Sequence, residues 1–146
     1  FTVLGALARS AADAPIAAAA VVAYPVTDLE GLAERSHRFE RHATDTLVGP
    51  SGSPAMRDRS PVWFAHEIRC PLLVFHGADD PVVPVEQSRV LVERMRAVGN
   101  DVDLVVYPGE GHGFRLAANQ LDEYERMADF LGRHIPSTNP TRRSRR

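Results

Sequence analysis

The sequence has few of the features that would suggest a secreted, membrane or nucleic-acid-binding protein. It contains one cysteine, Cys70, so no disulfide can form within the chain, and we expect a cytoplasmic protein. No apolar run approaches the roughly 18 residues of a membrane-spanning helix, and no signal-peptide pattern is found, so we expect no membrane partner. Lysine is absent, since all 17 basic residues are arginine, and a net charge of −2 gives no reason to expect nucleic acid.

The composition instead fits one globular domain with a core. Apolar residues make up 44% and charged residues 25% of the 146 residues, which argues against disorder. The chain starts inside a helix-like pattern, at Phe1 and not at methionine, so we expect it to be part of a longer protein. Residues 136–146 are polar and end in an arginine cluster. We predict a disordered basic tail there, because blocks of like charge are usually solvated arms.

Apolar runs alternate with helical patterns along residues 1–135. Strands are predicted at 16–24, 71–75 and 102–107, and helices at 1–9, 85–98 and 116–135. Between the first two strands, residues 29–48 show weak helical periodicity, residues 49–54 read as a loop, and a helix start is predicted at Ser60. This order predicts an α/β fold, a parallel sheet with helices on both faces. An incomplete sheet would leave an open strand edge, so self-association through that edge is expected.

The last predicted helix has an apolar face at helical spacing. Its members follow the i, i+3, i+7 spacing and are Leu121, Tyr124, Ala128, Leu131 and Ile135.

Two of the predicted strands end in turns that carry an acid and a histidine. Asp79 and Asp80 follow the strand at 71–75, and His112 follows the strand at 102–107. Catalytic groups collect where parallel strands end, so either aspartate could reach His112. A carboxylate beside a histidine is the acid–base half of a nucleophilic triad. The alternative, that the two aspartates merely form a turn before a proline, explains one loop but not the pair.

The nucleophile of such a triad is missing from the sequence. None of the eight serines stands in a G-x-S-x-G turn between a strand and a helix. Ser51 comes nearest, in Gly49-Pro50-Ser51-Gly52, but lacks both flanking elements. Cys70 precedes its strand and would lie at the opposite end of the sheet. We therefore expect the chain by itself to be inactive, with the nucleophile supplied by the parent protein.

The other histidines show no metal-ligand spacing. CxxC, HExxH and HxH patterns are all absent, so we predict neither a metal nor another cofactor. His76, which directly follows the strand at 71–75, is interpreted as a structural hydrogen-bonding residue near the predicted site.

Longer motifs extend from residue 24 to residue 115. They are YPVTDL at 24–29, HRFE at 37–40, LVGP at 47–50, RDRSP at 57–61, CPLLVFHG at 70–77, DPVVP at 80–84 and EGHGFR at 110–115. Together they resemble the C-terminal part of the catalytic domain of prolyl oligopeptidase-type serine peptidases. Within that family, the acylaminoacyl-peptidase and dipeptidyl-peptidase-like branch is the most similar.

The resemblance implies a partial α/β-hydrolase fold over residues 1–135 that lacks the nucleophile elbow. It implies Asp80 as the triad acid and His112 as the base. Val83, three residues after the acid, matches a position that lines the pocket for the substrate side chain. The implied activity of the parent protein is release of acyl-aminoacyl or dipeptidyl units from short peptides. Two alternatives stay open: a carboxylesterase or dienelactone-type hydrolase that acts on an ester, and a non-catalytic binding domain.

Overall fold

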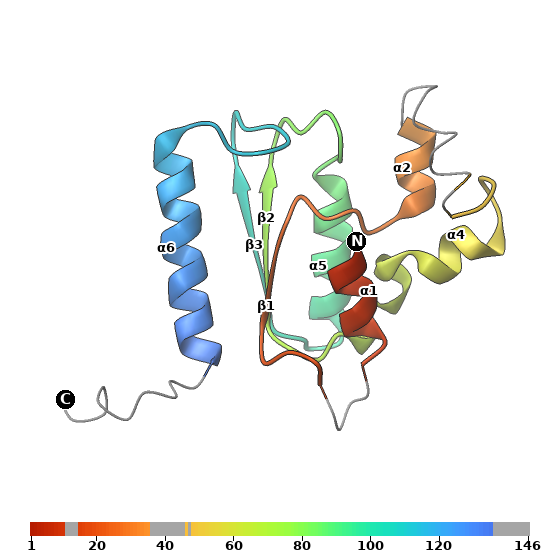
Figure 1. Cartoon of the computed structure of the whole chain (residues 1–146), viewed down its shortest axis with the longest axis horizontal. Coiled ribbons are helices and arrows are strands. Elements are labelled where there is room, and N and C mark those ends of the chain that lie inside the picture. The colour runs from red at the N-terminus through yellow and green to blue at the C-terminus, as the bar shows by residue number, and fades with distance from the viewer. Residues whose placement is uncertain (11–14, 36–45, 47, 136–146) are drawn as a thin grey trace.

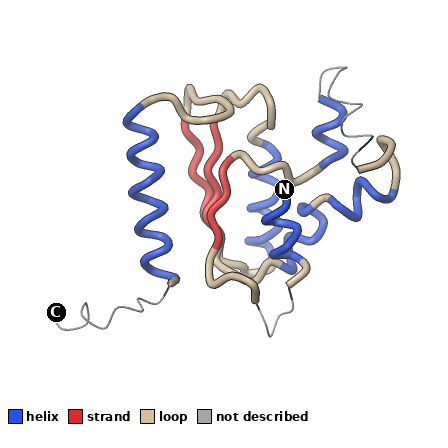
Figure 2. The backbone as a smooth tube through the Cα atoms, in the orientation of Figure 1, coloured by secondary structure: helices blue, strands red, loops and turns tan. Residues whose placement is uncertain are grey.

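Three parallel strands form a single sheet in the computed structural model, which describes residues 1–10, 15–35, 46 and 48–135. The strands run in the spatial order β1 (Ala20–Ala23), β2 (Leu72–Gly77) and β3 (Val102–Tyr107), and Figure 2 shows them side by side. Both pairings are parallel, with Val74 of β2 opposite Val22 and Leu104. The predicted parallel α/β sheet is therefore confirmed. The predicted tail at 136–146 and the motif at 37–40 lie outside the described residues.

Helices cover both faces of this sheet, as predicted (Figure 1). One face carries α1 (Thr2–Ala8), the 3-10 helix η1 (Pro61–Glu67) and α5 (Glu86–Ala97). The opposite face carries α6 (Ala117–His134). Two short helices, α2 (Leu29–Arg35) and α4 (Pro54–Arg59), lie beyond α1 on the side away from α6 (Figure 1).

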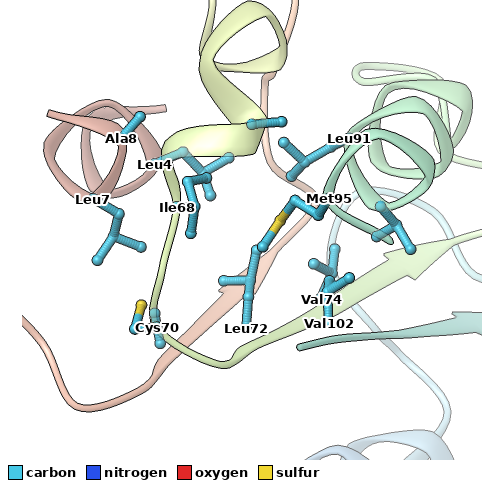
Figure 3. Packing of buried hydrophobic residues seen from close by; sticks show 13 residues of the cluster. Leu4, Leu7, Ala8, Ile68, Cys70, Leu72, Val74, Leu91, Met95 and Val102 are labelled. Carbon is cyan, nitrogen blue, oxygen red and sulfur yellow. The ribbon is translucent and has the colours of Figure 1, made fainter. Parts of the chain in front are cut away.

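The central strand β2 is buried along its whole length because both of its faces are covered. Successive side chains point to opposite faces, so Leu72 and Val74 join the core under α1 and α5, whereas Leu73 and Phe75 join the core under α6. Figure 3 shows the first of these cores, with Leu72 and Val74 beneath the helices. Each fully buried Leu, Phe or Met side chain stabilises the fold by about 1.5–3 kcal/mol.

The first strand is shorter than predicted. The apolar run at 16–24 predicted a strand, but only Ala20–Ala23 pairs with β2. The next residue, Tyr24, has a φ of 39°, which is incompatible with extended backbone, and the strand ends there.

The segment before β2 contains a helix, α4, that was not predicted from the sequence. Residues 49–54 were expected to form a loop, yet Pro54 is the first residue of α4, where a fixed φ suits a helix start. The Ser60 hydroxyl donates to the Met56 carbonyl (2.7 Å), and Met56 is fully buried, so the helix is anchored at its C-terminal end. The predicted start after Ser60 is present, although the element is the 3-10 helix η1.

Only part of the apolar face expected on α6 packs on the sheet. Leu121 is 60% and Tyr124 67% exposed, whereas Phe130 is the buried residue of this helix. Phe130 shares the core under α6 with Leu73 and Phe75. The hydroxyl of Tyr107 also donates to Asp122 (2.8 Å). These two anchors set the rotation of the helix. Leu131 of the apolar face packs partly buried against the same core, whereas Leu121, Tyr124 and Ile135 are exposed.

No helix among the described residues is long and apolar enough to cross a membrane. Strands β1 and β3 form the two edges of the described sheet. Self-association through such an edge stays a prediction.

Gly77 ends β2 where the backbone of residues 110–111 passes directly over it. A Cβ at this position would overlap the carbonyl oxygens of Glu110 and Gly111. We therefore expect Gly77→Ala to lower the free energy of unfolding by about 3 kcal/mol, measured by urea denaturation followed through Trp63 fluorescence. Gly132→Ala is the matched control. Nothing lies within 4 Å of a Cβ there, and alanine should stabilise α6 by about 1 kcal/mol. Equal effects of the two changes would contradict this packing.

Candidate active site

The loops that follow β2 and β3 lie at the same end of the sheet (Figure 1). The first loop carries Asp80 and the second carries His112. Main-chain hydrogen bonds join the loops, since the Ala78 N–H donates to the Tyr107 carbonyl and the Asp79 N–H donates to the Glu110 carbonyl, both at 2.9 Å. The two loops are therefore a single connected unit and not two independent turns.

The imidazole of His112 contacts the carboxylate of Asp80, and not that of Asp79. The distance from Nδ1 of His112 to Oδ2 of Asp80 is 2.9 Å. The Asp80 side chain is fully buried, whereas 39% of the His112 side chain is exposed. Because Nδ1 donates to the carboxylate, Nε2 of the neutral ring has a free lone pair and can accept a proton. The structure thus brings together the acid and the histidine that the sequence placed after successive strands.

The buried Asp80 carboxylate is compensated by the main chain of its own loop. Oδ1 accepts hydrogen bonds from the N–H groups of Val82 (2.8 Å) and Val83 (2.9 Å). Burying a charge without partners is strongly unfavourable. With Oδ1 occupied by these two donors, Oδ2 faces Nδ1 of His112 at 2.9 Å and lies 3.5 Å from Nε2 of the buried His76, so the carboxylate is held in one orientation.

His76 supports the acid loop from the interior of the domain. Its Nε2 lies 2.8 Å from the carbonyl oxygen of Val83, and its Nδ1 lies 2.7 Å from the hydroxyl of Ser88. A carbonyl can only accept, so Nε2 carries the proton and Nδ1 accepts from Ser88. Burial lowers the pKa of His76, which favours this neutral form. His76 is therefore a structural hydrogen-bonding residue near the site, the role that the sequence indicated.

Val83 contributes its main chain to the site, and its side chain is 3% exposed. Its predicted contact with a substrate side chain stays a prediction. The neighbouring Val82 is 50% exposed and, together with His112 and Leu116, lines an open cavity of about 570 Å³. Among the described residues, no group of three His, Cys, Asp or Glu side chains is placed to bind a metal.

Glu110 is a residue of the site that the sequence reading missed. Its carboxylate is almost fully buried and accepts from the N–H groups of Arg115 (2.8 Å) and Leu116 (2.9 Å) and from the amide of Asn119 (2.8 Å). These hydrogen bonds lower the pKa of Glu110. The carboxylate thereby ties the His112 loop to the first turn of α6. The sequence did contain a signal for this role, because Glu110 is an acidic residue shortly before the predicted helix start, where a carboxylate is stabilising.

The sequence of this chain is similar to those of known peptidases and esterases. The sequence model of the prolyl oligopeptidase family matches residues 6–138. The Esterase LipC of Mycobacterium tuberculosis is 49% identical over 61 residues, which cover 41% of this chain and 15% of the esterase. The Dipeptidyl peptidase family member 6 of Caenorhabditis elegans is 31% identical over 80 residues, or 55% of this chain and 11% of that protein. The chain thus spans only a small part of these relatives.

A solved structure matches most of the chain. The Mycobacterium tuberculosis puromycin-hydrolyzing peptidase superimposes with a TM-score of 0.85 at 30% identity. The match covers 92% of this chain and 20% of the peptidase chain. The described fold is therefore an α/β-hydrolase fold in part.

We expect acid to weaken the link between the His112 loop and α6. Because folding lowers the pKa of Glu110, its stabilising contribution is present above the unfolded value of roughly 4.3 and is lost as pH falls through the folded value. Glu110→Gln should lower the urea midpoint at neutral pH and reduce the further loss between about pH 5 and pH 3. Glu125→Gln, at an exposed position of α6, should change neither. An unaltered acid response in Glu110→Gln would contradict this role.

Proposed function

The chain belongs to the prolyl oligopeptidase family, and from this membership we propose that the full-length protein is a serine hydrolase in which Asp80 is the triad acid and His112 the general base. The observation that carries the proposal is the 2.9 Å contact between Oδ2 of Asp80 and Nδ1 of His112. A buried carboxylate that orients a partly exposed imidazole is the arrangement that nucleophilic hydrolysis requires.

Each group has a defined part in the proposed reaction. Nε2 of His112 accepts the proton of a serine hydroxyl, supplied by another part of the full-length protein, as the serine oxygen bonds to the substrate carbonyl carbon. The imidazolium then returns that proton to the departing amine or alcohol. Asp80 stabilises the imidazolium and keeps Nδ1 protonated, so Nε2 always faces the reacting groups.

We propose short peptides as substrates, with release of acyl-aminoacyl or dipeptidyl units. The likeness to a dipeptidyl peptidase and to a solved peptidase supports this choice. Val83 is proposed to line the pocket for the substrate side chain. Its main-chain N–H donates to Asp80, which places it next to the proposed acid.

Ester hydrolysis is the second candidate. It is supported by the 49% identity to Esterase LipC, because the same acid and base serve ester and amide substrates equally well. What differs is the leaving group, since an alcohol departs more readily than an amine.

The triad assignment predicts a large and selective loss of turnover. In the full-length protein, His112→Ala and Asp80→Asn should each lower kcat by roughly 10³- to 10⁴-fold and abolish labelling by a fluorophosphonate probe. His66→Ala is the control, because His66 is exposed in η1 and should leave turnover unchanged. A full-length protein that the probe never labels, while a known serine hydrolase reacts, would instead indicate a non-catalytic binding domain.

Substrate class is tested by comparing amides with esters of the same acyl group. We expect the full-length protein to cleave acyl-aminoacyl or dipeptidyl p-nitroanilides as well as the matching p-nitrophenyl esters, with kcat/KM as the measured quantity. Cleavage of the esters alone would support the esterase alternative and contradict the peptidase proposal.

A further inference from the structure

Tyr24 ends β1 in a backbone conformation that residues with a side chain rarely adopt. Its φ is 39°, and among the described residues every other positive φ belongs to a glycine. The left-handed region is unfavourable for residues with a Cβ. It persists where the surrounding structure imposes it, often at functional sites. The Tyr24 N–H still donates to the Phe75 carbonyl (2.8 Å), so the ladder between β1 and β2 imposes the conformation from one side.

This conformation brings the Tyr24 ring against His112. The two ring centroids are 4.7 Å apart and the ring planes are inclined by 49°. The same tyrosine ring meets Phe114 edge-on at 5.5 Å, and Phe114 meets Tyr107 at 4.8 Å. The Tyr24 ring is therefore fixed between the imidazole and the core under α6.

Among the described residues, the His112 ring has a hydrogen bond to Asp80 in addition to its contact with Tyr24. Gly111 and Gly113 flank it, and neither has a side chain. The hydrogen bond from Nδ1 to Asp80 fixes one ring atom but allows the ring plane to turn about that bond. Contact with an aromatic ring from a different strand restricts that rotation. Small errors in the placement of a catalytic group have large effects on rate.

We propose that Tyr24 is a positioning residue whose ring holds the His112 imidazole in the plane needed for proton transfer. The inference rests on the proposed role of His112 as the general base. It assigns the effect to the ring and not to the phenol oxygen. Burial, followed by the charges of Glu123 and Asp80, raises the pKa of Tyr24, so the hydroxyl stays protonated at neutral pH and does not compete as a base.

Two substitutions in the full-length protein separate the ring from the backbone. Tyr24→Phe keeps the ring and removes the hydroxyl. Tyr24→Asn removes the ring and tolerates the left-handed backbone. We expect Tyr24→Phe to retain kcat within about threefold and Tyr24→Asn to lower kcat by about 10- to 100-fold with little change in KM. Equal kcat in Tyr24→Asn and wild type, or equal losses in the two variants, would overturn the proposal.

A spectroscopic measurement decides the ring contact without relying on hydrolysis. A neighbouring aromatic ring shifts the carbon-bound proton resonances of an imidazole, so histidine-labelled NMR spectra of the full-length protein report the contact at His112. Tyr24→Phe should preserve the shifted resonances, and Tyr24→Asn should move them. Unmoved resonances in Tyr24→Asn would overturn the inference. Tyr24→Gly, which also accepts a positive φ, replaces Tyr24→Asn if that variant does not fold.

The two readouts also separate this inference from the proposed function. A wild-type protein without hydrolase activity contradicts the function, whereas the NMR comparison still decides whether Tyr24 sets the orientation of His112. An active wild type with the expected NMR shifts, but with full kcat in Tyr24→Asn, contradicts the positioning role alone.

Discussion

A buried carboxylate must be surrounded by hydrogen-bond donors. The donors around Asp80 connect the two loops at the carboxyl ends of β2 and β3. One oxygen accepts from the main chain of its own loop, and the other accepts from His112 of the neighbouring loop. The two loops follow adjacent parallel strands, so their ends must lie side by side. The contact between Asp80 and His112 therefore depends on β2 pairing with β3 in the observed register.

Two histidines near this charge show how surroundings assign different roles to one residue type. His76 is fully buried and both of its ring nitrogens are engaged, by Val83 and Ser88. Burial lowers its pKa and keeps it neutral, which suits a structural brace. His112 is partly exposed and uses only Nδ1 for Asp80, which suits a group that exchanges protons.

The His112 loop is supported from three separate elements. Gly77 of β2 allows the backbone of residues 110–111 to pass close by, Glu110 ties the loop to α6, and Tyr24 at the end of β1 contacts the imidazole. None of these groups would bond to substrate in the proposed reaction. They limit the movement of the histidine. This restriction costs free energy of folding, because the Tyr24 backbone is strained and the Glu110 carboxylate is buried.

The sequence by itself determined the parallel α/β class, the strand at 102–107, the helices α5 and α6 to within one residue at each end, and the occurrence of an acid and a histidine after successive strands. These features depend on residues close together in the chain, whose periodicity and turn chemistry are local. Only the tertiary structure decided which face of α6 is buried, that Glu110 binds the first turn of that helix, and that Tyr24 meets His112. Those outcomes depend on side chains from distant segments competing for the same space, which local periodicity cannot encode.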